Sequence, residues 1–241
     1  MVMPLWDDNP LKLPRPPLVT WGLIAANVAF YLLTVLAPAG DAQAVVENFA
    51  LIPANITATP INVTRVPPYV TLVTSMFLHA NIWHLAGNMI FLWVFGDDVE
   101  EAMGPLRFIG FYLGSGVLAA LAYVASAPHS LQPLVGASGA IAGVLAAYLM
   151  FRPCQKVSVF VPYVLLWLFI RPVVRIDAYW VLGGWILLQF WDLSSDSRSD
   201  VAYMAHVGGF IAGGAAFPLM RYRVVKLFQC VRSAEEAAPP L

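Results

Sequence analysis

Four polar side chains that could carry out acyl-transfer chemistry stand inside apolar stretches of the sequence: His84, Asn88, Ser138 and His206. A serine hydroxyl is a weak nucleophile unless an adjacent base takes its proton, and a histidine is the most frequent base. The negative charge that develops on a carbonyl oxygen during acyl transfer needs fixed hydrogen-bond donors. These residue types therefore indicate a serine nucleophile, a histidine base and an oxyanion site.

The spacing assigns a role to each of the four side chains. His84 and Asn88 are four residues apart, so in a helix they share one face and could donate hydrogen bonds to one point. His206 could serve as the base for Ser138. Because the apolar stretches hold no carboxylate and no lysine suited to act as base, we predict a Ser-His dyad and not a triad.

The composition indicates a membrane protein. Of 241 residues, 60% are hydrophobic and 11% are charged, whereas a soluble domain carries about 25% charged residues. Because this number of charges cannot cover a water-facing surface, we expect lipid to surround much of the protein. The net charge of −1 gives no reason to expect a nucleic-acid partner. Cys154 and Cys230 lie far apart in the sequence, and we expect neither to form a disulfide.

The apolar stretches predict an all-α polytopic fold with six transmembrane helices. The polar segment 1–17 precedes a membrane domain over residues 18–220, which contains a long outer loop over residues 38–76, and residues 221–241 form a tail. A short apolar segment, Val157–Ile170, has basic residues at both ends and is predicted to be interfacial or re-entrant. Each candidate span suits a bilayer core of about 30 Å; the six are Leu18–Ala37, Phe77–Gly96, Leu106–Ala125, Leu134–Phe151, Ala178–Trp191 and Val201–Met220.

The basic residues orient these spans. With the N-terminus in the cytoplasm, 11 of the 13 lysines and arginines fall in cytoplasmic segments, and only Arg65 and Arg198 lie outside. This asymmetry follows the positive-inside rule. We therefore expect an integral membrane protein with both termini in the cytoplasm, in a bacterial plasma membrane.

In this topology the polar residues fall into one layer. The second, fourth and sixth spans all enter from the outer face, which puts His84, Ser138 and His206 roughly 6–10 Å below it at 1.5 Å per residue. Each residue has a plainer explanation when it is taken alone, since the small residues around Ser138 and after His206 favour close helix packing. Packing does not explain why all of them occur at one depth.

These motifs resemble those of the rhomboid family of intramembrane serine proteases. Gly136-Ala137-Ser138-Gly139 is similar to its nucleophile motif, and His206 with Gly209 and Gly213 is similar to its AHxxGxxxG motif. His84 and Asn88 are similar to its HxxxN motif. The resemblance runs from about Leu51 to Gly214.

The resemblance implies a six-helix core around a water-filled cavity open to the outer face. It implies Ser138 as nucleophile and His206 as base, with His84, Asn88 and the Ser138 backbone N–H stabilising the oxyanion. Gly136, Gly139, Gly209 and Gly213 would allow the fourth and sixth helices to pack closely. The implied partners are the lipid bilayer and single-pass transmembrane protein substrates, and no cofactor or metal is implied.

The chain departs from the family pattern at two places. Val70-Thr71 replaces a Trp-Arg pair found in some members, and Ala142 replaces a tyrosine that stacks on the base; Tyr203 or Phe210 could take over that role. The main alternative function is a non-proteolytic rhomboid-like protein that binds membrane clients. A transporter is disfavoured because the sequence shows no internal repeat, and a metalloprotease because it has no HExxH motif.

Overall fold

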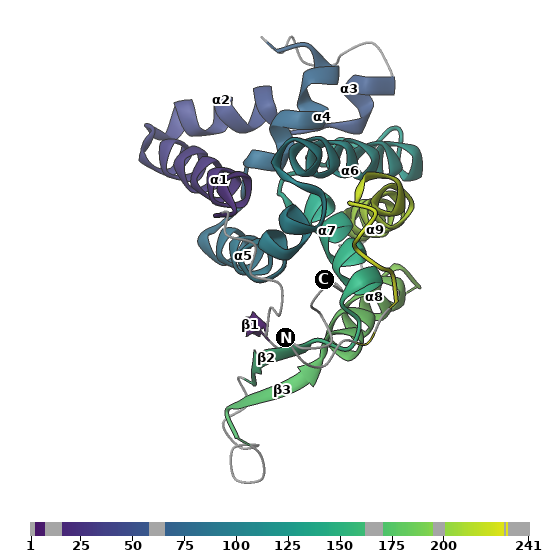
Figure 1. Cartoon of the computed structure of the whole chain (residues 1–241). Helices are drawn as coiled ribbons and strands as arrows, with labels where there is room; N and C mark the ends of the chain where they lie inside the picture. The colour runs from purple at the N-terminus through teal and green to yellow at the C-terminus, as the bar shows by residue number, and fades with distance from the viewer. Residues whose placement is uncertain are drawn as a thin grey trace.

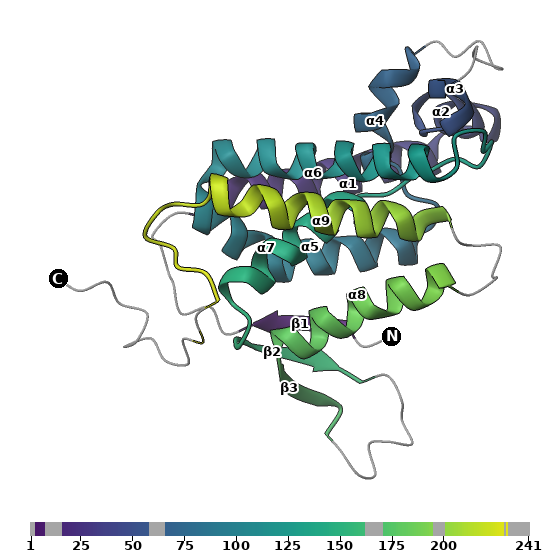
Figure 2. The same cartoon turned by 90° about the vertical axis from the view of Figure 1, so that its right-hand side faces the viewer.

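The computed structural model describes residues 3–7, 16–57, 66–161, 171–194, 201–228 and 230. It is mostly helical, and its long helices lie within a few residues of the predicted spans (Figure 1 and Figure 2). These helices are α1 (Leu18–Leu36), α5 (Ile82–Met103), α6 (Pro105–Ser126), α7 (Ser138–Phe151), α8 (Ala178–Ser194) and α9 (Val201–Met220).

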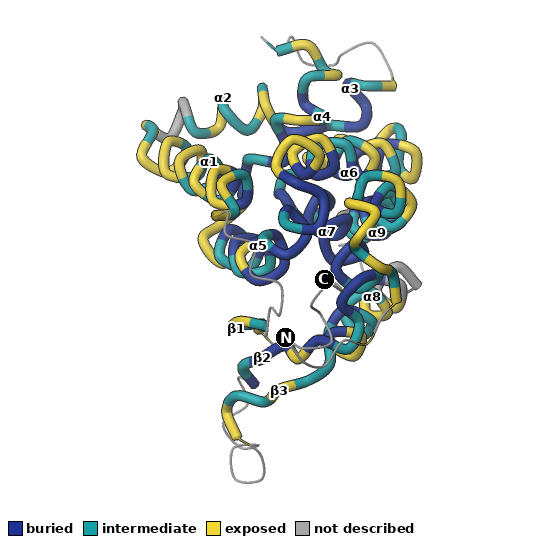
Figure 3. The backbone as a smooth tube through the Cα atoms, in the orientation of Figure 1, coloured by how far each residue is buried: buried dark blue, intermediate teal, exposed yellow. Residues whose placement is uncertain are grey.

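Helix α7 forms the centre of the bundle. It packs against α5, α6 and α9, and most of its residues are buried, as Figure 3 shows. Its sequence, SGAIAGVLAAYLMF, is rich in glycine and alanine, which lets neighbouring backbones approach closely. The residue at its first position, Ser138, is thereby fixed by packing on several sides.

Within the described residues, α1 and α6 are long and apolar enough to cross a membrane by length and composition. Helix α7 and the segment Ala178–Gln189 of α8 are apolar but shorter. Helix α1 packs on the bundle through one face only, and Leu33 and Leu36 are 69% and 79% exposed. An apolar surface of this kind is suited to contact with lipid.

Helix α5 differs from the predicted second span at both ends. It starts at Ile82 and not at Phe77, because the side chain of Asn81 accepts a hydrogen bond from the His84 N–H at 2.9 Å and caps the helix. It continues past Gly96 to Met103. The added turns contain Glu100, a residue that hydropathy alone would exclude from a span.

Hydrogen bonds to the start of α1 explain how the charge of Glu100 is tolerated in α5. Its carboxylate accepts hydrogen bonds from the backbone N–H of Val19 at 3.1 Å and of Thr20 at 2.8 Å, and from the Thr20 hydroxyl at 2.8 Å. These groups form the start of α1, where unpaired N–H groups and the helix dipole favour an anion. The carboxylate therefore joins α5 to α1.

The predicted outer loop contains several short helices. They are α2 (Ala39–Phe49), α3 (Pro53–Thr57), η1 (Pro68–Val70), α4 (Thr71–Thr74) and η2 (Ser75–Phe77). In Figure 2, α2, α3 and α4 lie together beyond one end of the α6 helix. This end of the bundle is where α7 and α9 begin.

Below the helices in Figure 2 lies a small sheet of β1 (Met3–Asp7), β2 (Lys156–Phe160) and β3 (Val173–Asp177), in the order β1-β2-β3. Both pairings are antiparallel, and Lys156 is in register with Asp177. The segment Val157–Ile170, predicted to be interfacial or re-entrant, is thus a strand at its start, where Val157, Ser158 and Val159 are all buried. Residues 162–170 of that segment lie outside the described residues.

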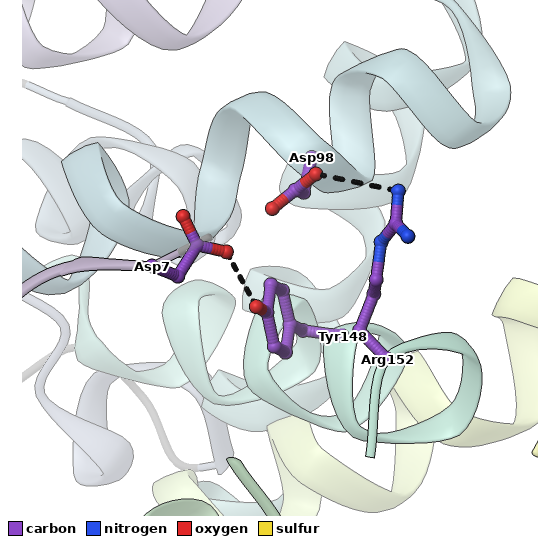
Figure 4. A network of polar contacts seen from close by, with 4 residues as sticks. All are labelled: Asp7, Asp98, Tyr148 and Arg152. Atoms are coloured by element: carbon purple, nitrogen blue, oxygen red, sulfur yellow. Dashed lines mark hydrogen bonds and ion pairs between the residues drawn. The ribbon is translucent and has the colours of Figure 1, made fainter. Parts of the chain in front are cut away.

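A buried polar network ties this sheet to the helices (Figure 4). The Tyr148 hydroxyl on α7 donates a hydrogen bond to Asp7 on β1. One turn further along, Arg152 pairs with Asp98 on α5 at 3.9 Å. The N-terminal strand and two core helices are therefore linked through charged and hydroxyl groups.

The expectation for the cysteines is wrong. Cys154 and Cys230 form a disulfide, with Cα atoms 5.0 Å apart. The two cysteines are 76 positions apart in sequence, and they meet because the chain after α9 turns back along the end of α7. The backbone N–H of Phe228 donates to the Met150 carbonyl and holds this returning segment.

Candidate active site

Ser138 and His206 lie side by side. Ser138 is the first residue of α7, His206 is in the second turn of α9, and Ser138 Oγ is 2.8 Å from His206 Nε2. This distance suits a hydrogen bond between a hydroxyl and a ring nitrogen. Both side chains are partly buried. The structure thus brings together the two residues that the sequence analysis paired.

Glycines make this approach possible. A Cβ placed on Gly209 would overlap the carbonyl oxygen of Gly139, and one on Gly213 would overlap the backbone of Gly143. Both pairs advance by four residues along each helix, so α7 and α9 run parallel with their backbones in contact. The backbones of Gly139, Gly209 and Gly213 lie at this contact, and Gly143 is a partner that was not predicted. A Cβ on Gly139 itself would meet the Ala119 side chain on α6 at 2.7 Å.

Gly136 serves a different purpose from the one predicted. It precedes α7, which starts at Ser138 and not at Leu134, and its φ of +122° is a conformation that favours glycine. A Cβ there would lie 2.8 Å from His84 Nε2 and 3.5 Å from Asn88 Nδ2. Gly136 therefore lets the turn before Ser138 pack against α5. It does not bring α7 close to α9.

This contact brings His84 and Asn88 to the serine from the side of α5. Asn88 is buried, and its Nδ2 atom donates a hydrogen bond to His79 Nε2 at 2.9 Å. The rings of His79 and His84 meet edge to face, with centroids 5.1 Å apart. His79 is not among the predicted site residues, although a histidine five residues before His84 is visible in the sequence.

His206 has further partners on α8 and α9. Its Nδ1 lies 2.6 Å from Gln189 Oε1, and its ring centroid is 5.7 Å from that of Trp185 and 6.3 Å from that of Tyr203. Tyr203 was a predicted neighbour, whereas Gln189 and Trp185 were missed. Gln189 could have been noticed as a polar side chain within the apolar stretch Ala178–Trp191, and the structure shows that it is buried.

The start of α7 adds backbone donors beside Ser138. Its N-cap residue, Ala137, makes no side-chain capping hydrogen bond. The first N–H groups of a helix have no acceptor within the helix, and they favour a nearby negative charge. Ser138 thus carries both a hydroxyl next to an imidazole and a backbone N–H oriented by the helix.

Together these groups could support acyl transfer. A hydroxyl next to a base, with amide and imidazole groups on the adjacent helix, is an arrangement in which a carbonyl carbon could be attacked and its oxygen stabilised. Among the described residues, no group of three or more His, Cys, Asp or Glu is arranged to hold a metal ion.

Known proteins include several with sequences similar to this chain. A family model described as Rhomboid domain matches residues 67–223. Rhomboid protein 1, mitochondrial, of Saccharomyces cerevisiae is 35% identical over 96 residues, which cover 38% of this chain and 28% of that protein. The human presenilin-associated rhomboid-like protein, mitochondrial, is 29% identical over 150 residues, covering 59% of this chain and 35% of that protein.

A bacterial protein is also similar. Rhomboid protease GluP of Bacillus subtilis is 42% identical over 78 residues, which cover 32% of this chain and 15% of that protein. The matched regions thus span between 15% and 35% of the lengths of these three relatives.

Proposed function

The chain belongs to the rhomboid family, and we propose that it is an intramembrane serine endopeptidase that uses a Ser138–His206 dyad. The observation that carries this proposal is the 2.8 Å contact between Ser138 Oγ and His206 Nε2. A name that includes "protease" on one relative adds support.

In the first half of the reaction, His206 Nε2 takes the proton of the Ser138 hydroxyl while Oγ attacks the carbonyl carbon of the scissile peptide bond. The tetrahedral intermediate carries its negative charge on the former carbonyl oxygen. When it collapses, His206 gives the proton to the leaving nitrogen, the C–N bond breaks and an acyl-enzyme remains. Water then attacks this ester with His206 again acting as base, which releases the acid and restores Ser138.

We assign oxyanion stabilisation to His84, Asn88 and the backbone N–H of Ser138. Gly136 supports this role because its missing side chain lets α5 approach the turn before the nucleophile. The second hydrogen of Asn88 Nδ2 remains to be donated while the first is held by His79. Removing one such donor usually costs about 10²–10³-fold in kcat.

The substrates that we propose are single-pass transmembrane proteins, cleaved within or near their membrane segments. The proposed arrangement is six membrane spans, α1 and α5–α9, with both termini in the cytoplasm. Of the three relatives named above, two are mitochondrial and one is bacterial, so support for a bacterial plasma membrane comes from the Bacillus subtilis protein.

The test uses the purified chain in detergent with a model single-pass substrate. We expect the wild type to cleave it and to react with a fluorophosphonate probe, and both Ser138→Ala and His206→Ala to do neither. Ser126→Ala is a matched control, because within the described part of the chain the Ser126 hydroxyl donates to the Tyr123 carbonyl at the end of α6. Cleavage that persists in Ser138→Ala would refute the proposal, and binding of the substrate without cleavage by the wild type would favour a client-binding protein.

A further inference from the structure

We propose that Gln189 is a positioning residue that keeps the His206 ring in the tautomer with its proton on Nδ1. This inference rests on the proposed function, since it concerns the same imidazole. Its structural basis is the 2.6 Å distance between His206 Nδ1 and Gln189 Oε1. Gln189 would thus take the place that an aspartate holds in a Ser-His-Asp triad.

The orientation of the Gln189 amide supports this assignment. On its other side, Nε2 of Gln189 lies 3.4 Å from the backbone carbonyl of Trp185, one turn earlier in α8. A carbonyl oxygen only accepts hydrogen bonds, so it selects the NH₂ side of the amide. The amide oxygen then faces His206, where it can only accept, and Nδ1 must carry the hydrogen.

The tautomer decides whether the dyad can work. A neutral imidazole has one N–H and one unprotonated nitrogen. With the hydrogen on Nδ1, the lone pair of Nε2 faces Ser138 Oγ at 2.8 Å and can take its proton. With the hydrogen on Nε2, the ring could only donate to Ser138 and could not act as its base.

The surroundings of His206 explain why an amide can hold this place. Gln189 is buried, at 6% exposure, in a helix proposed to lie in the membrane, where a buried carboxylate would be costly. Among the residues that the structure describes, the titratable side chains around His206 are Tyr203 on its own helix and His84 on α5, and Ser138 comes from α7. A neutral acceptor can therefore fix the ring without adding a charge to the site.

Aromatic contacts restrict the ring but do not set its proton. Trp185 packs on the imidazole at 42° and Tyr203 meets it at 78°. These contacts limit the tilt of the ring, and they would be equally satisfied by either tautomer. The hydrogen bond to Gln189 is the contact among them that distinguishes the two nitrogens.

The experiment compares Gln189→Leu and Gln189→Glu with Gln43→Leu as the matched control. Gln43 lies on the exposed face of α2, where its side chain contacts only Glu47 in the described hydrogen bonds. Three quantities are measured in detergent: the rate constant of fluorophosphonate labelling at Ser138, kcat and KM across pH, and the ¹⁵N signals of the His206 ring, which report its tautomer.

For Gln189→Leu we expect labelling and kcat to fall at least about tenfold, short of the ~10⁴-fold seen when a triad histidine has the wrong tautomer. KM should change little, and the ¹⁵N signals should show loss of the Nδ1–H tautomer. Gln189→Glu should recover labelling, and the acidic limb of its kcat profile should move to higher pH, because a carboxylate favours the charged imidazolium, which cannot act as base. Gln43→Leu should match the wild type.

Labelling of Gln189→Leu at the wild-type rate would overturn the inference. The inference would also be overturned if both Gln189 variants lost labelling and kcat equally, with unchanged ¹⁵N signals of His206 and no shift in the acidic limb of the kcat profile. That combination would indicate that Gln189 only packs against its neighbours. A third outcome separates this inference from the proposed function. If the wild type is neither labelled nor cleaves substrate, but Gln189→Leu still loses the Nδ1–H tautomer that the wild type shows, the positioning contact stands and the proposed protease function fails.

Discussion

Gly213 on α9 lies against Gly143 on α7 so closely that a Cβ on Gly213 would overlap the Gly143 backbone. This contact lies five residues beyond Ser138 on α7 and seven residues beyond His206 on α9. Because the helices run parallel, their separation at Gly213 governs their separation at the dyad. The 2.8 Å distance between Ser138 Oγ and His206 Nε2 thus depends on residues that take no part in the chemistry.

The first prediction concerns this glycine contact. Gly213→Ala should push α9 away from α7, destabilise the fold by about 1–3 kcal/mol as overpacking usually does, and lower fluorophosphonate labelling of Ser138. Gly214→Ala is the matched control, since its Cβ would meet only the Ala146 side chain at 3.8 Å, an ordinary contact. Thermal unfolding in detergent and the labelling rate are the measurements. Equal behaviour of the two variants would contradict the prediction.

The second prediction concerns the support of Asn88 by His79. His79→Leu removes the acceptor at 2.9 Å and frees the Asn88 amide to rotate, so kcat should fall although His79 touches no reacting atom. Asn88→Ala should cost about 10²–10³-fold in kcat. The double variant should lose little more than Asn88→Ala alone, because both changes remove one interaction. Fully additive losses in kcat would show that His79 acts independently of Asn88.

The helices and the dyad could be predicted because apolar length and the resemblance both report on them. The ends of α5 could not, since Glu100 is satisfied by the start of α1, a contact between residues about 80 apart in sequence. Gly136, in the turn before Ser138, was predicted to pack α7 against α9, but its backbone angle and its contact with His84 give it a different role.

The partners of His206 were hidden for a related reason. Gln189 and Trp185 lie in the fifth predicted span, and nothing in their spacing indicates which helix they face. The disulfide between Cys154 and Cys230 likewise depends on the return of the chain after α9. Residues that act through a neighbouring helix become visible only when the helices are placed.

The third prediction concerns the proposed orientation in the membrane. Eleven of the 13 basic residues lie in segments assigned to the cytoplasm, and Ser138 is at the start of α7, whereas β2 follows the other end of that helix. A fluorescent-protein fusion after Leu241 should therefore fluoresce, and alkaline phosphatase inserted near residue 60 should be active, in a bacterial host. Active phosphatase fused at the C-terminus would contradict the proposed orientation, because it would place that terminus outside the cytoplasm.

The fourth prediction concerns the buried ion pair of Asp98 and Arg152, whose side chains are 0% and 6% exposed. Arg152→Met leaves the Asp98 carboxylate buried without its cation, and we expect a loss of about 3–5 kcal/mol in stability. The double variant Asp98→Leu/Arg152→Met removes both charges and should recover most of that loss, since buried pairs replaced by apolar groups are often neutral.

Lys156→Met is the matched control for this pair. Lys156 pairs with Asp177 at 2.7 Å across β2 and β3, but its side chain is 49% exposed, so its removal should cost about 1 kcal/mol or less. Thermal and denaturant unfolding of the four proteins in one detergent is the measurement. If the double variant is as unstable as Arg152→Met, the loss comes from Arg152 packing on the Phe151 ring, 5.2 Å from its guanidinium, and not from an uncompensated charge.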